Sequence, residues 1–436
     1  MTTRRDFIST SSATLGAAVA AAPVLRAQDP APSPEYRVAM IGCGGRGSGA
    51  ADQNLSVTGP NVKLVAMADM FEDRLKGSLN ELKNKHGVKV DVPDDRQFIG
   101  FDAFQKVLAL PDVNVVILAT PPGFRPFHFE AAVKAGKHVF MEKPVCVDSF
   151  GANMVMAAAK EADAKNLKVV VGLQRRYQVE YLETYKQVQA GMIGDIVRAE
   201  VYWNDNRPWV RDRKEGDTEM EYQLRNWYHF NWLCGDNICE QHIHNIDVAN
   251  WFLGDKHPVR ARGFGGRQSL TDKKYGEIFD HHSVEFIYDN GVIVHSFCEH
   301  LPNTWARVSE TIVGTKGVAV AGMIRDHSGK TLWRHKSDGD PNPYQTEHDK
   351  FYEAIQKGTP LNNAHYGVNS SFTSVLGRYA TYSGKEIGWD EALACNLRLS
   401  PESFGADAQP LVLPDASGNY PIAIPGSYDW KTGKNA

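Results

Sequence analysis

The run Glu142-Lys143-Pro144 contains a lysine at the end of an apolar stretch, a position well suited to catalysis. The apolar stretch has the pattern of a buried strand, and the proline makes a rigid corner after it. In open α/β sheets, ligands bind at the carboxyl ends of the strands. An ammonium group held there can stabilise negative charge that develops on a substrate oxygen. We therefore predict that Lys143 is catalytic and that Glu142 lies beside it near a cofactor.

A second group of ionisable residues lies on the segment from Asp236 to Gly254. Asp236 is a suitable N-cap and Gly254 a suitable residue after the last turn, so the segment predicts one helix of about five turns. Spacings of four and three would place Glu240, His244 and Asp247 on one face of that helix. Such a stripe of ionisable groups is costly to bury without a use.

The two groups together can support the oxidation of an alcohol. When a hydride leaves carbon, a base must take the hydroxyl proton, and an imidazole suits that task. Lys143 would lower the pKa of His244 and keep it neutral. Glu240 would orient substrate hydroxyls or the imidazole, and Asp247 would support the same group. The alternative is a surface helix with ordinary polar pairs. No metal site is predicted, because two histidines two residues apart cannot share a helical face.

A glycine pattern near the start of the chain predicts a dinucleotide site. Gly42, Gly44 and Gly47 form G-x-G-x-x-G between a strand and a helix. Asp69 ends the next strand, where its carboxylate would hold the ribose hydroxyls and repel a ribose phosphate, so we expect NAD rather than NADP. His128 is equally compatible with a capping or core role. The predicted cofactor-binding residues are Gly42, Gly44, Gly45, Arg46, Gly47, Asp69, Thr120, Pro121, His128, Glu142 and Lys143.

An aromatic-rich region between residues 202 and 232 suggests a carbohydrate or polyol substrate, because flat rings stack on the apolar faces of sugars while polar neighbours bind hydroxyls. The same rings could equally belong to a hydrophobic core. The predicted substrate-binding residues are Arg175, Tyr177, Trp203, Trp227 and His244.

The distribution of apolar runs predicts two different sheet architectures, one after the other along the chain. Continuous valine and isoleucine runs up to residue 172 suit a parallel sheet covered on both faces, as in an α/β Rossmann domain. After residue 194 the runs alternate with period two, which predicts an α+β domain with an open, mostly antiparallel sheet. We therefore divide the chain into a signal peptide (1–27), a linker (28–35), a Rossmann domain (36–173), an open-sheet substrate and oligomerisation domain (174–345), helices that return to the Rossmann domain (346–394) and a loop-rich tail (395–436).

The N-terminus resembles a twin-arginine export signal, with Arg4 and Arg5 ahead of an alanine-rich run. Its removal would take away three arginines and one aspartate and change the net charge from −4 to −6. A mildly acidic surface argues against nucleic acid as a partner, and no later run is apolar enough to span a membrane. We expect a periplasmic protein that forms a dimer or tetramer.

From Tyr36 to about Leu393 the sequence resembles the glucose-fructose oxidoreductase, inositol dehydrogenase and MocA (Gfo/Idh/MocA) family. The motifs that carry the resemblance are the glycine pattern with Asp69, the run from Ala135 to Pro144, the helix with His244 and Asp247, and the run from Tyr382 to Glu391. The resemblance implies NAD or NADP as cofactor and oxidation of a sugar or cyclitol with the lysine of Glu-Lys-Pro. The family helix usually has aspartate where this chain has Glu240.

Other functions remain open from the sequence. One is an NAD-assisted glycoside hydrolase or lyase, in which transient oxidation activates a neighbouring C–H bond. Another is a non-catalytic carbohydrate-binding protein. Export of a folded protein would also let NAD be loaded beforehand, so we expect the cofactor to stay bound during turnover.

Overall fold

The computed structural model describes residues 35–206, 208–405 and 408–436. The predicted signal peptide and the predicted linker up to residue 34 lie outside these ranges. Glu35, which we assigned to the linker, is instead the first residue of strand β1 (Glu35–Ile41). Residues 35–436 form one compact unit.

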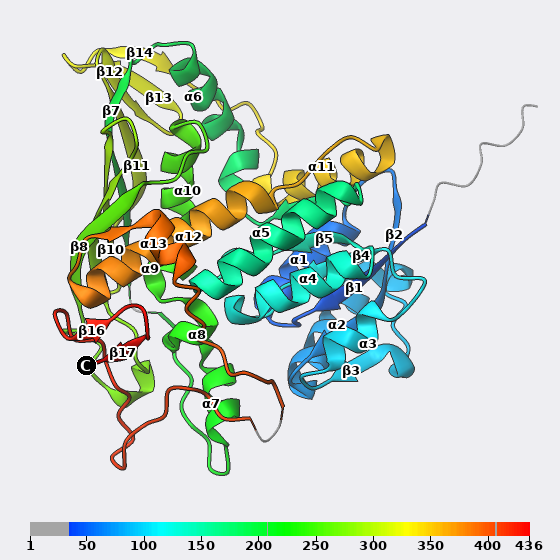
Figure 1. Ribbon diagram of the computed structural model, residues 1–436. Coiled ribbons are helices and arrows are strands. Elements are labelled where there is room, and N and C mark those ends of the chain that lie inside the picture. The colour runs from blue at the N-terminus through cyan, green and yellow to red at the C-terminus, as the bar shows by residue number, and fades with distance from the viewer. Residues whose placement is uncertain (1–34, 207, 406–407) are drawn as a thin grey trace, which may run out of the picture. The chain divides into compact units, whose positions relative to one another are not determined.

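The first half of this unit contains a six-stranded parallel sheet, which confirms the predicted Rossmann architecture (Figure 1). The order is β3-β2-β1-β4-β5-β6. Its remaining strands are β2 (Asn61–Asp69), β3 (Gln97–Ile99), β4 (Val115–Leu118), β5 (His138–Met141) and β6 (Val169–Val171). Its helices are α1 (Gly45–Leu55), α2 (Glu72–His86), α3 (Ala103–Leu108), α4 (Arg125–Lys134) and α5 (Ser149–Ala164).

Helices cover both faces of this sheet, which explains why its strands are continuous apolar runs. Along β1, Ala39 and Ile41 belong to the core shared with α3, α4 and α5. Val38 and Met40 point the other way, into the core shared with α1 and α2. Strand β3 was not predicted, because it is short and only partly buried.

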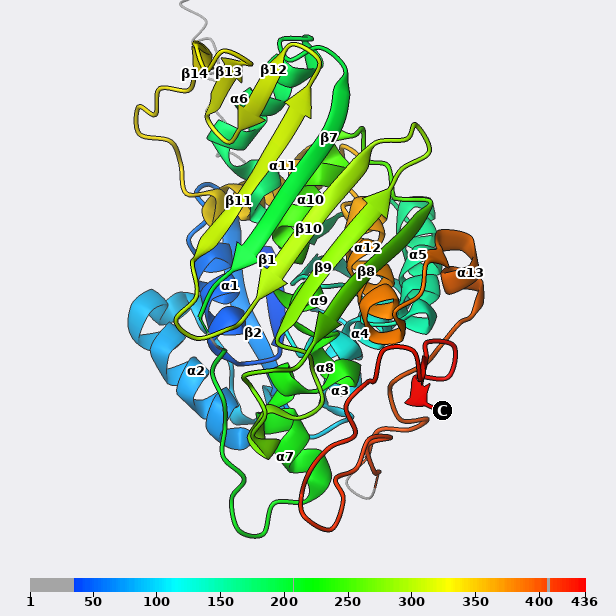
Figure 2. The same cartoon turned by 90° about the vertical axis from the view of Figure 1, so that its left-hand side faces the viewer.

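The second half contains a nine-stranded sheet, which confirms the predicted open and mostly antiparallel architecture. The order is β14-β13-β12-β11-β7-β10-β9-β8-β15, and β7 and β10 are parallel neighbours. Its strands are β7 (Ile196–Asn204), β8 (Arg260–Gly266), β9 (His281–Ile287), β10 (Ile293–Glu299), β11 (Arg307–Gly314), β12 (Gly317–Val320), β13 (Met323–Asp326), β14 (Thr331–Arg334) and β15 (Ile387–Gly388). Figure 2 shows one face of the sheet toward the viewer, with the helices behind it.

Helices fill the space behind the second sheet and connect the two halves. They are α6 (Val179–Gln189), α7 (Glu219–Arg225), α8 (Asn231–Cys234), α9 (Asn237–Glu240), α10 (Ile243–Phe252), α11 (Pro343–Lys357), α12 (Ala364–Ser383) and α13 (Trp389–Ala394). Helix α12 is buried along most of its length and packs on α5, α10 and β8. A Cβ atom at Gly377 would lie 2.7 Å from the ring of Phe286, so this close packing requires glycine there.

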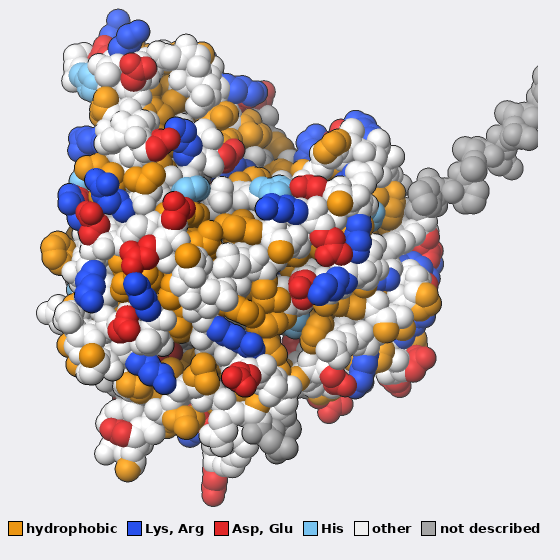
Figure 3. All heavy atoms as spheres, viewed as in Figure 1, with side chains coloured by type: hydrophobic (Ala, Val, Ile, Leu, Met, Phe, Trp, Pro, Cys, Tyr) orange, Lys and Arg blue, Asp and Glu red, His pale blue; other side chains and the backbone are white. Residues whose placement is uncertain are grey.

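The tail after α13 has only two short strands among its described residues, β16 (Tyr428–Asp429) and β17 (Lys434–Asn435). In Figure 1 it is orange to red and runs beside α7 and α8. On the face in Figure 3, basic and acidic side chains are interspersed, without a large patch of one sign. No helix among the described residues is long and apolar enough to cross a membrane.

Candidate active site

The turn between β1 and α1 has the geometry of a phosphate-binding loop. Gly42 has a φ of +98°, and a Cβ there would lie 2.5 Å from the backbone of Ala119 and Thr120. A Cβ on Gly47 would lie 2.0 Å from the carbonyl oxygen of Gly42. By contrast, Cβ atoms on Gly44 and Gly45 would meet nothing within 4 Å. No side chain caps the start of α1, so its first N–H groups are available to an anion in that open space.

Asp69 lies at the carboxyl end of β2, directly beside this loop. Its Oδ2 accepts a hydrogen bond from the N–H of Cys43 at 2.6 Å, and its Oδ1 accepts one from the N–H of Phe71 at 2.8 Å. Burial raises the pKa of Asp69, while these two N–H groups act in the opposite direction. The carboxylate is therefore held at the edge of the pocket in one orientation.

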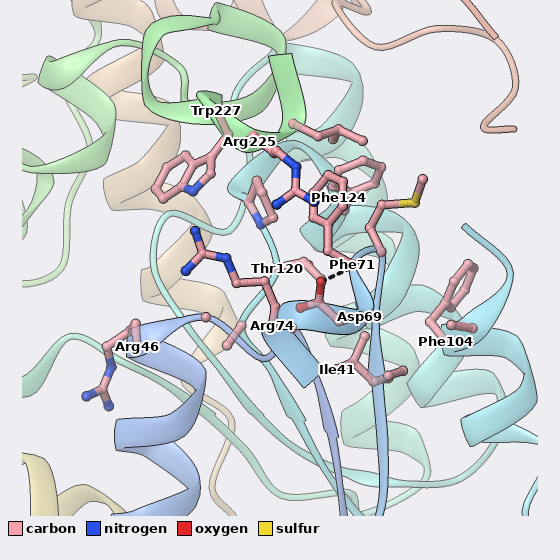
Figure 4. Close-up of a pocket in the computed structure, with 18 of the residues that line it drawn as sticks. Ile41, Arg46, Asp69, Phe71, Arg74, Phe104, Thr120, Phe124, Arg225 and Trp227 are labelled. Carbon is pink, nitrogen blue, oxygen red and sulfur yellow. Dashed lines mark hydrogen bonds between the residues drawn. The ribbon is translucent and has the colours of Figure 1, made fainter. Parts of the chain in front are cut away.

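The glycine loop and Asp69 border a cavity of about 420 Å³, which is in the size range of ligand sites. Its upper wall comes from the second half of the chain, and we call Trp209, Arg211, Leu224, Arg225 and Trp227 the roof. Figure 4 shows Arg225 and Trp227 above Asp69 and Phe71. Arg46 and Arg74 also line the cavity, so its lining is rich in arginine and suits an anionic ligand.

Thr120, Pro121 and His128 lie where the glycine loop meets α4. His128 Nδ1 is 3.2 Å from the hydroxyl of Thr120, and its ring lies between Phe104 and Phe124. Burial, with a smaller contribution from Arg125, lowers the pKa of His128 to about 3. His128 is therefore a neutral part of the cavity wall that fixes Thr120.

Glu142 connects this cavity to the predicted catalytic lysine. Arg46 Nε donates to Glu142 Oε1 at 2.5 Å, and the Glu142 side chain is only 8% exposed. Arg125 is bonded both to the Glu142 carbonyl and to the Thr120 carbonyl, so it ties the ends of β4 and β5 together. Lys143, the next residue, therefore lies at the same edge of the sheet as the cavity.

Lys143 is paired with Glu240 from the second half. Its Nζ donates to Glu240 Oε1 at 3.0 Å and also to the backbone carbonyl of Glu240. Both side chains are about 10% exposed. Burial raises the pKa of Glu240, and the ammonium of Lys143 acts against this. Glu240 Oε2 has no hydrogen-bond partner among the described residues.

His244 is on α10, with its ring stacked on Trp203 of β7 at 5.9 Å between centroids. It is 8% exposed, and no described residue hydrogen-bonds its ring nitrogens. Burial and then the positive charges of Lys143, Arg175 and Arg46 hold the pKa of His244 well below its usual value. The imidazole is therefore neutral and able to accept a proton.

Our prediction of one helix from Asp236 to Gly254 was wrong, because the segment is broken between α9 and α10. In a continuous helix, the N–H of His244 would bond to the carbonyl of Glu240. Lys143 occupies that carbonyl, and the N–H of His244 bonds to Gln241 at 3.3 Å instead. The predicted N-cap is present, since the side chain of Asp236 accepts from the N–H of Asn237.

Asp247 is consequently not in a common stripe with Glu240. It is 1% exposed, forms a two-oxygen pair with Arg176 and accepts a hydrogen bond from Ser370 at 2.7 Å. These partners connect α10 to α12 and to the segment after β6. Asp247 therefore helps to fix the position of α10 through its bonds to Arg176 and Ser370.

The predicted substrate residues are divided between several places. Trp203 stacks on His244, and Arg175 pairs with buried Glu310, which also accepts from Asn245 at 2.7 Å. Tyr177 donates to Asn363 at 2.6 Å, on the side of α12. Trp227, also predicted to contact substrate, lines the cavity beside the glycine loop and Asp69.

Sequence reasoning missed three arginines of the cavity lining. Arg74 stands in the first turn after Asp69, and this proximity was a usable signal. Arg211 and Arg225 had no such signal; Arg225 lies 152 residues after Asp73, with which it pairs. A contact between residues so far apart in sequence, and the direction in which such a side chain points, cannot be predicted from local spacing.

Comparison with known proteins places this geometry in a family. A model described as "Oxidoreductase family, NAD-binding Rossmann fold" matches residues 36–172, and one described as "GFO/IDH/MocA C-terminal domain" matches residues 181–320. The chain belongs to the Gfo/Idh/MocA family. The resemblance that we described from the motifs is therefore confirmed.

Several known proteins resemble the chain at low identity. An inositol 2-dehydrogenase of Rhizobium meliloti is 25% identical over 227 residues, which cover 52% of this chain and 57% of that protein. A glycosyl hydrolase family 109 protein of Streptomyces coelicolor is 23% identical over 420 residues, 88% of this chain and 83% of that protein. The crystal structure of an aldose-aldose oxidoreductase from Caulobacter crescentus has a TM-score of 0.64 at 18% identity, and the match covers 81% of this chain and all of that one.

Proposed function

We propose that this chain is an exported, NAD-dependent oxidoreductase that acts on a CH–OH group of a sugar, polyol or sugar derivative and keeps its cofactor bound. The observation that carries the proposal is the arrangement of Lys143, paired with Glu240, beside neutral His244 at the sheet edge that borders the nucleotide cavity. The family and the inositol dehydrogenases within it support the same activity.

The residues present fit a dinucleotide. The open space at Gly44 and Gly45 suits a pyrophosphate on the first N–H groups of α1, and Asp69 suits two ribose hydroxyls. When bound, the nicotinamide would accept the hydride that leaves the substrate carbon. Thr120 and His128 would border its ribose.

The chain's own residues then handle the proton and the charge. His244, neutral and without a hydrogen-bond partner among the described residues, would accept the substrate hydroxyl proton. The Lys143 ammonium, held by Glu240, would stabilise the negative charge that develops on that oxygen. Both groups are nearly enclosed, so little water weakens the charge of the Lys143 ammonium.

A substrate with several hydroxyl groups fits the polar atoms that the site leaves unpaired. Glu240 Oε2 can accept a hydrogen bond, and the buried Nε1 of Trp203 can donate one. The Trp203 ring next to His244 also suits the apolar face of a sugar ring. We therefore assign the substrate to the carbohydrate and polyol class.

A panel of sugars and polyols tests this activity. Full-length protein should show reduced-nicotinamide absorbance with at least one compound, in a stoichiometric burst if the cofactor stays bound. No response to any compound, with the cofactor demonstrably present, would contradict the proposed oxidation.

Export and cofactor retention rest on Arg4 and Arg5, which precede an apolar run. Cell fractionation should place the protein in the periplasm, and replacement of both arginines by lysine should keep it in the cytoplasm. Heating the exported protein should release about one dinucleotide per chain. A clean protein that turns over only with added NAD would contradict retention.

Redox-assisted cleavage of a glycoside is a second candidate, because the match to the glycosyl hydrolase family 109 protein covers most of both chains. Product analysis separates the two functions. Cleaved glycoside with no net change in NAD would favour this candidate, whereas an oxidised sugar would favour simple oxidation.

Asp69→Asn is expected to weaken NAD binding about tenfold and to narrow the difference between NAD and NADP. The carboxylate accepts ribose hydroxyls and repels a 2′-phosphate, and without it Arg74 and Arg225 would face that phosphate. Titration with each reduced dinucleotide measures both affinities. Asp102→Asn, which loses only the exposed pair with Lys106, is the control. Unchanged selectivity in Asp69→Asn would rule out this role for Asp69.

A further inference from the structure

The roof over the nucleotide cavity is joined to the Rossmann half by Arg225. Its guanidinium lies 3.8 Å above the ring of Phe71 and 3.3 Å from the carboxylate of Asp73. Both partners directly follow Asp69, so the roof closes over the end of the cavity where ribose hydroxyls would bind (Figure 4). A flat ligand at this end can stack on the guanidinium plane or on the ring of Trp227.

A nucleotide in this cavity is enclosed from two sides that belong to different halves of the chain. The glycine loop and Asp69 form one side, and the roof forms the other. Movement of the roof away from Phe71 would widen the opening through which a ligand this large enters and leaves. What holds the roof in place therefore controls how fast the cavity opens.

Tyr420 of the C-terminal tail contacts the two segments that carry the roof residues Arg225 and Trp227. The Tyr420 hydroxyl donates to Glu219 Oε1 at 2.5 Å, at the start of the helix that carries Arg225. Its ring packs edge-on against Phe230 at 5.0 Å, just after Trp227. Tyr420 is 6% exposed, so this contact is a fixed part of the packing.

The same helix has a second attachment to the tail. The side-chain amide of Gln223 donates to the carbonyl of Val412 at 2.8 Å. Gln223 also donates to Glu219 at 2.9 Å and accepts from the indole of Trp232 at 2.7 Å. The tail therefore binds both the first turn and the middle of α7.

Phe404 of the tail reaches the floor of the cavity. Its ring lies 4.9 Å from Phe124 and 6.4 Å from Phe101, both of which line the cavity in the Rossmann half. On its other side it is 6.5 Å from Trp232, next to the roof. The tail thus contacts both the floor of the cavity and the segments that carry the roof residues, and it lies beyond the ranges that the two family models match.

We propose that Phe404 and Tyr420 act as a clasp that keeps the roof closed over the adenosine end of the bound dinucleotide and so sets its exchange rate. This inference rests on the proposed function, since it assumes a dinucleotide in the cavity. Neither residue lines the cavity itself. They are positioning residues, and weakening them should ease opening without removing a contact to the nucleotide.

Stopped-flow fluorescence of NADH tests the clasp, with full-length protein from which any bound dinucleotide has first been removed. Tyr420→Phe removes two hydrogen bonds, the one that the hydroxyl donates to Glu219 and the one that it accepts from Arg213 at 3.1 Å, and Phe404→Leu removes the ring contacts. Each substitution should raise both the association and the dissociation rate constants about tenfold. The Kd should change less than about threefold, because a gate affects entry and exit equally. If the substitutions only weakened the structure around the bound nucleotide, the dissociation rate constant alone would rise.

Tyr428→Phe is the matched control, because Tyr428 is a buried tyrosine of the same tail that packs on Tyr382 and has no contact with the roof. Glu219→Gln, which also weakens the ion pair of Glu219 with Arg213, provides a second way to weaken the Tyr420 bond. Thermal unfolding verifies that each variant is folded. Rates within twofold of the original protein in Tyr420→Phe, Phe404→Leu and Glu219→Gln would overturn the clasp while leaving the proposed function intact. Failure of the unaltered protein to bind NADH after its bound dinucleotide has been removed would instead overturn the proposed function, and the clasp with it.

Discussion

Lys143→Met should lower kcat by about 10²- to 10⁴-fold and leave the dinucleotide bound. The ammonium is the only cation hydrogen-bonded to the Glu240 carboxylate among the described residues, and it stands next to the predicted base. Without it, the other positive charges that act on His244 are those of Arg175 and Arg46, which are already paired with Glu310 and Glu142 and are less able to stabilise a developing alkoxide. Cofactor affinity should be retained, because Lys143 does not line the nucleotide cavity.

Single-turnover absorbance with a responsive sugar measures this effect, and the released dinucleotide per chain measures retention. Lys143→Arg keeps the charge but replaces a compact ammonium by a planar group, so it should not restore the rate. Lys134→Met, which removes an exposed lysine paired only with Glu130, is the control. A kcat within threefold of the original in Lys143→Met would exclude a catalytic lysine.

The second large effect is expected at His244, where His244→Asn should lower kcat by about 10²- to 10⁴-fold. The pKa of His244 lies well below its usual value, because of burial first and of Lys143, Arg175 and Arg46 next. A base works only in its neutral form, so kcat/KM of the unaltered protein should not fall at acid pH until well below the usual histidine pKa of about 6.5.

The variant Lys143→Met also tests the assignment of His244 as the base. Loss of the neighbouring positive charge should raise the pKa of His244, so protonation should begin at higher pH. The acid limb of the residual kcat/KM profile should therefore shift to higher pH in Lys143→Met, and it should not shift in Lys134→Met. The pH profile of His244→Asn should lack that limb. An acid limb that stays in His244→Asn would identify another group as the base.

Much of the nucleotide half could be predicted from the sequence. Strands that are covered on both faces have to be continuous apolar runs, as β1 is, and such runs are visible without a structure. The glycine positions are equally local, because Gly42 needs a positive φ and Gly47 needs space next to Gly42. Short strands such as β3 and β14 were missed, because they are only partly buried and carry no clear periodicity.

The division of roles among Glu240, His244 and Asp247 could not be predicted in the same way. Helical spacing put them in one stripe, but an ammonium from 97 residues earlier occupies the carbonyl that a continuous helix would use. Asp247 then pairs with Arg176, and Glu240 pairs with Lys143. Helical periodicity describes bonds between residues that are close in sequence, and it contains no information about a competing donor from a distant segment, here the loop after β5.

The sequence by itself therefore determined the two sheet architectures, the glycine loop, the acid that follows it and the chemical types of the predicted catalytic pair. The tertiary structure alone decided which carboxylate pairs with Lys143, that Trp227 and three further arginines line the nucleotide cavity, and that the tail packs on the helix that carries Arg225. The physical reason is that backbone conformation and burial patterns arise from residues a few positions apart. Ion pairs and cavity walls arise where packed elements from distant parts of the chain meet.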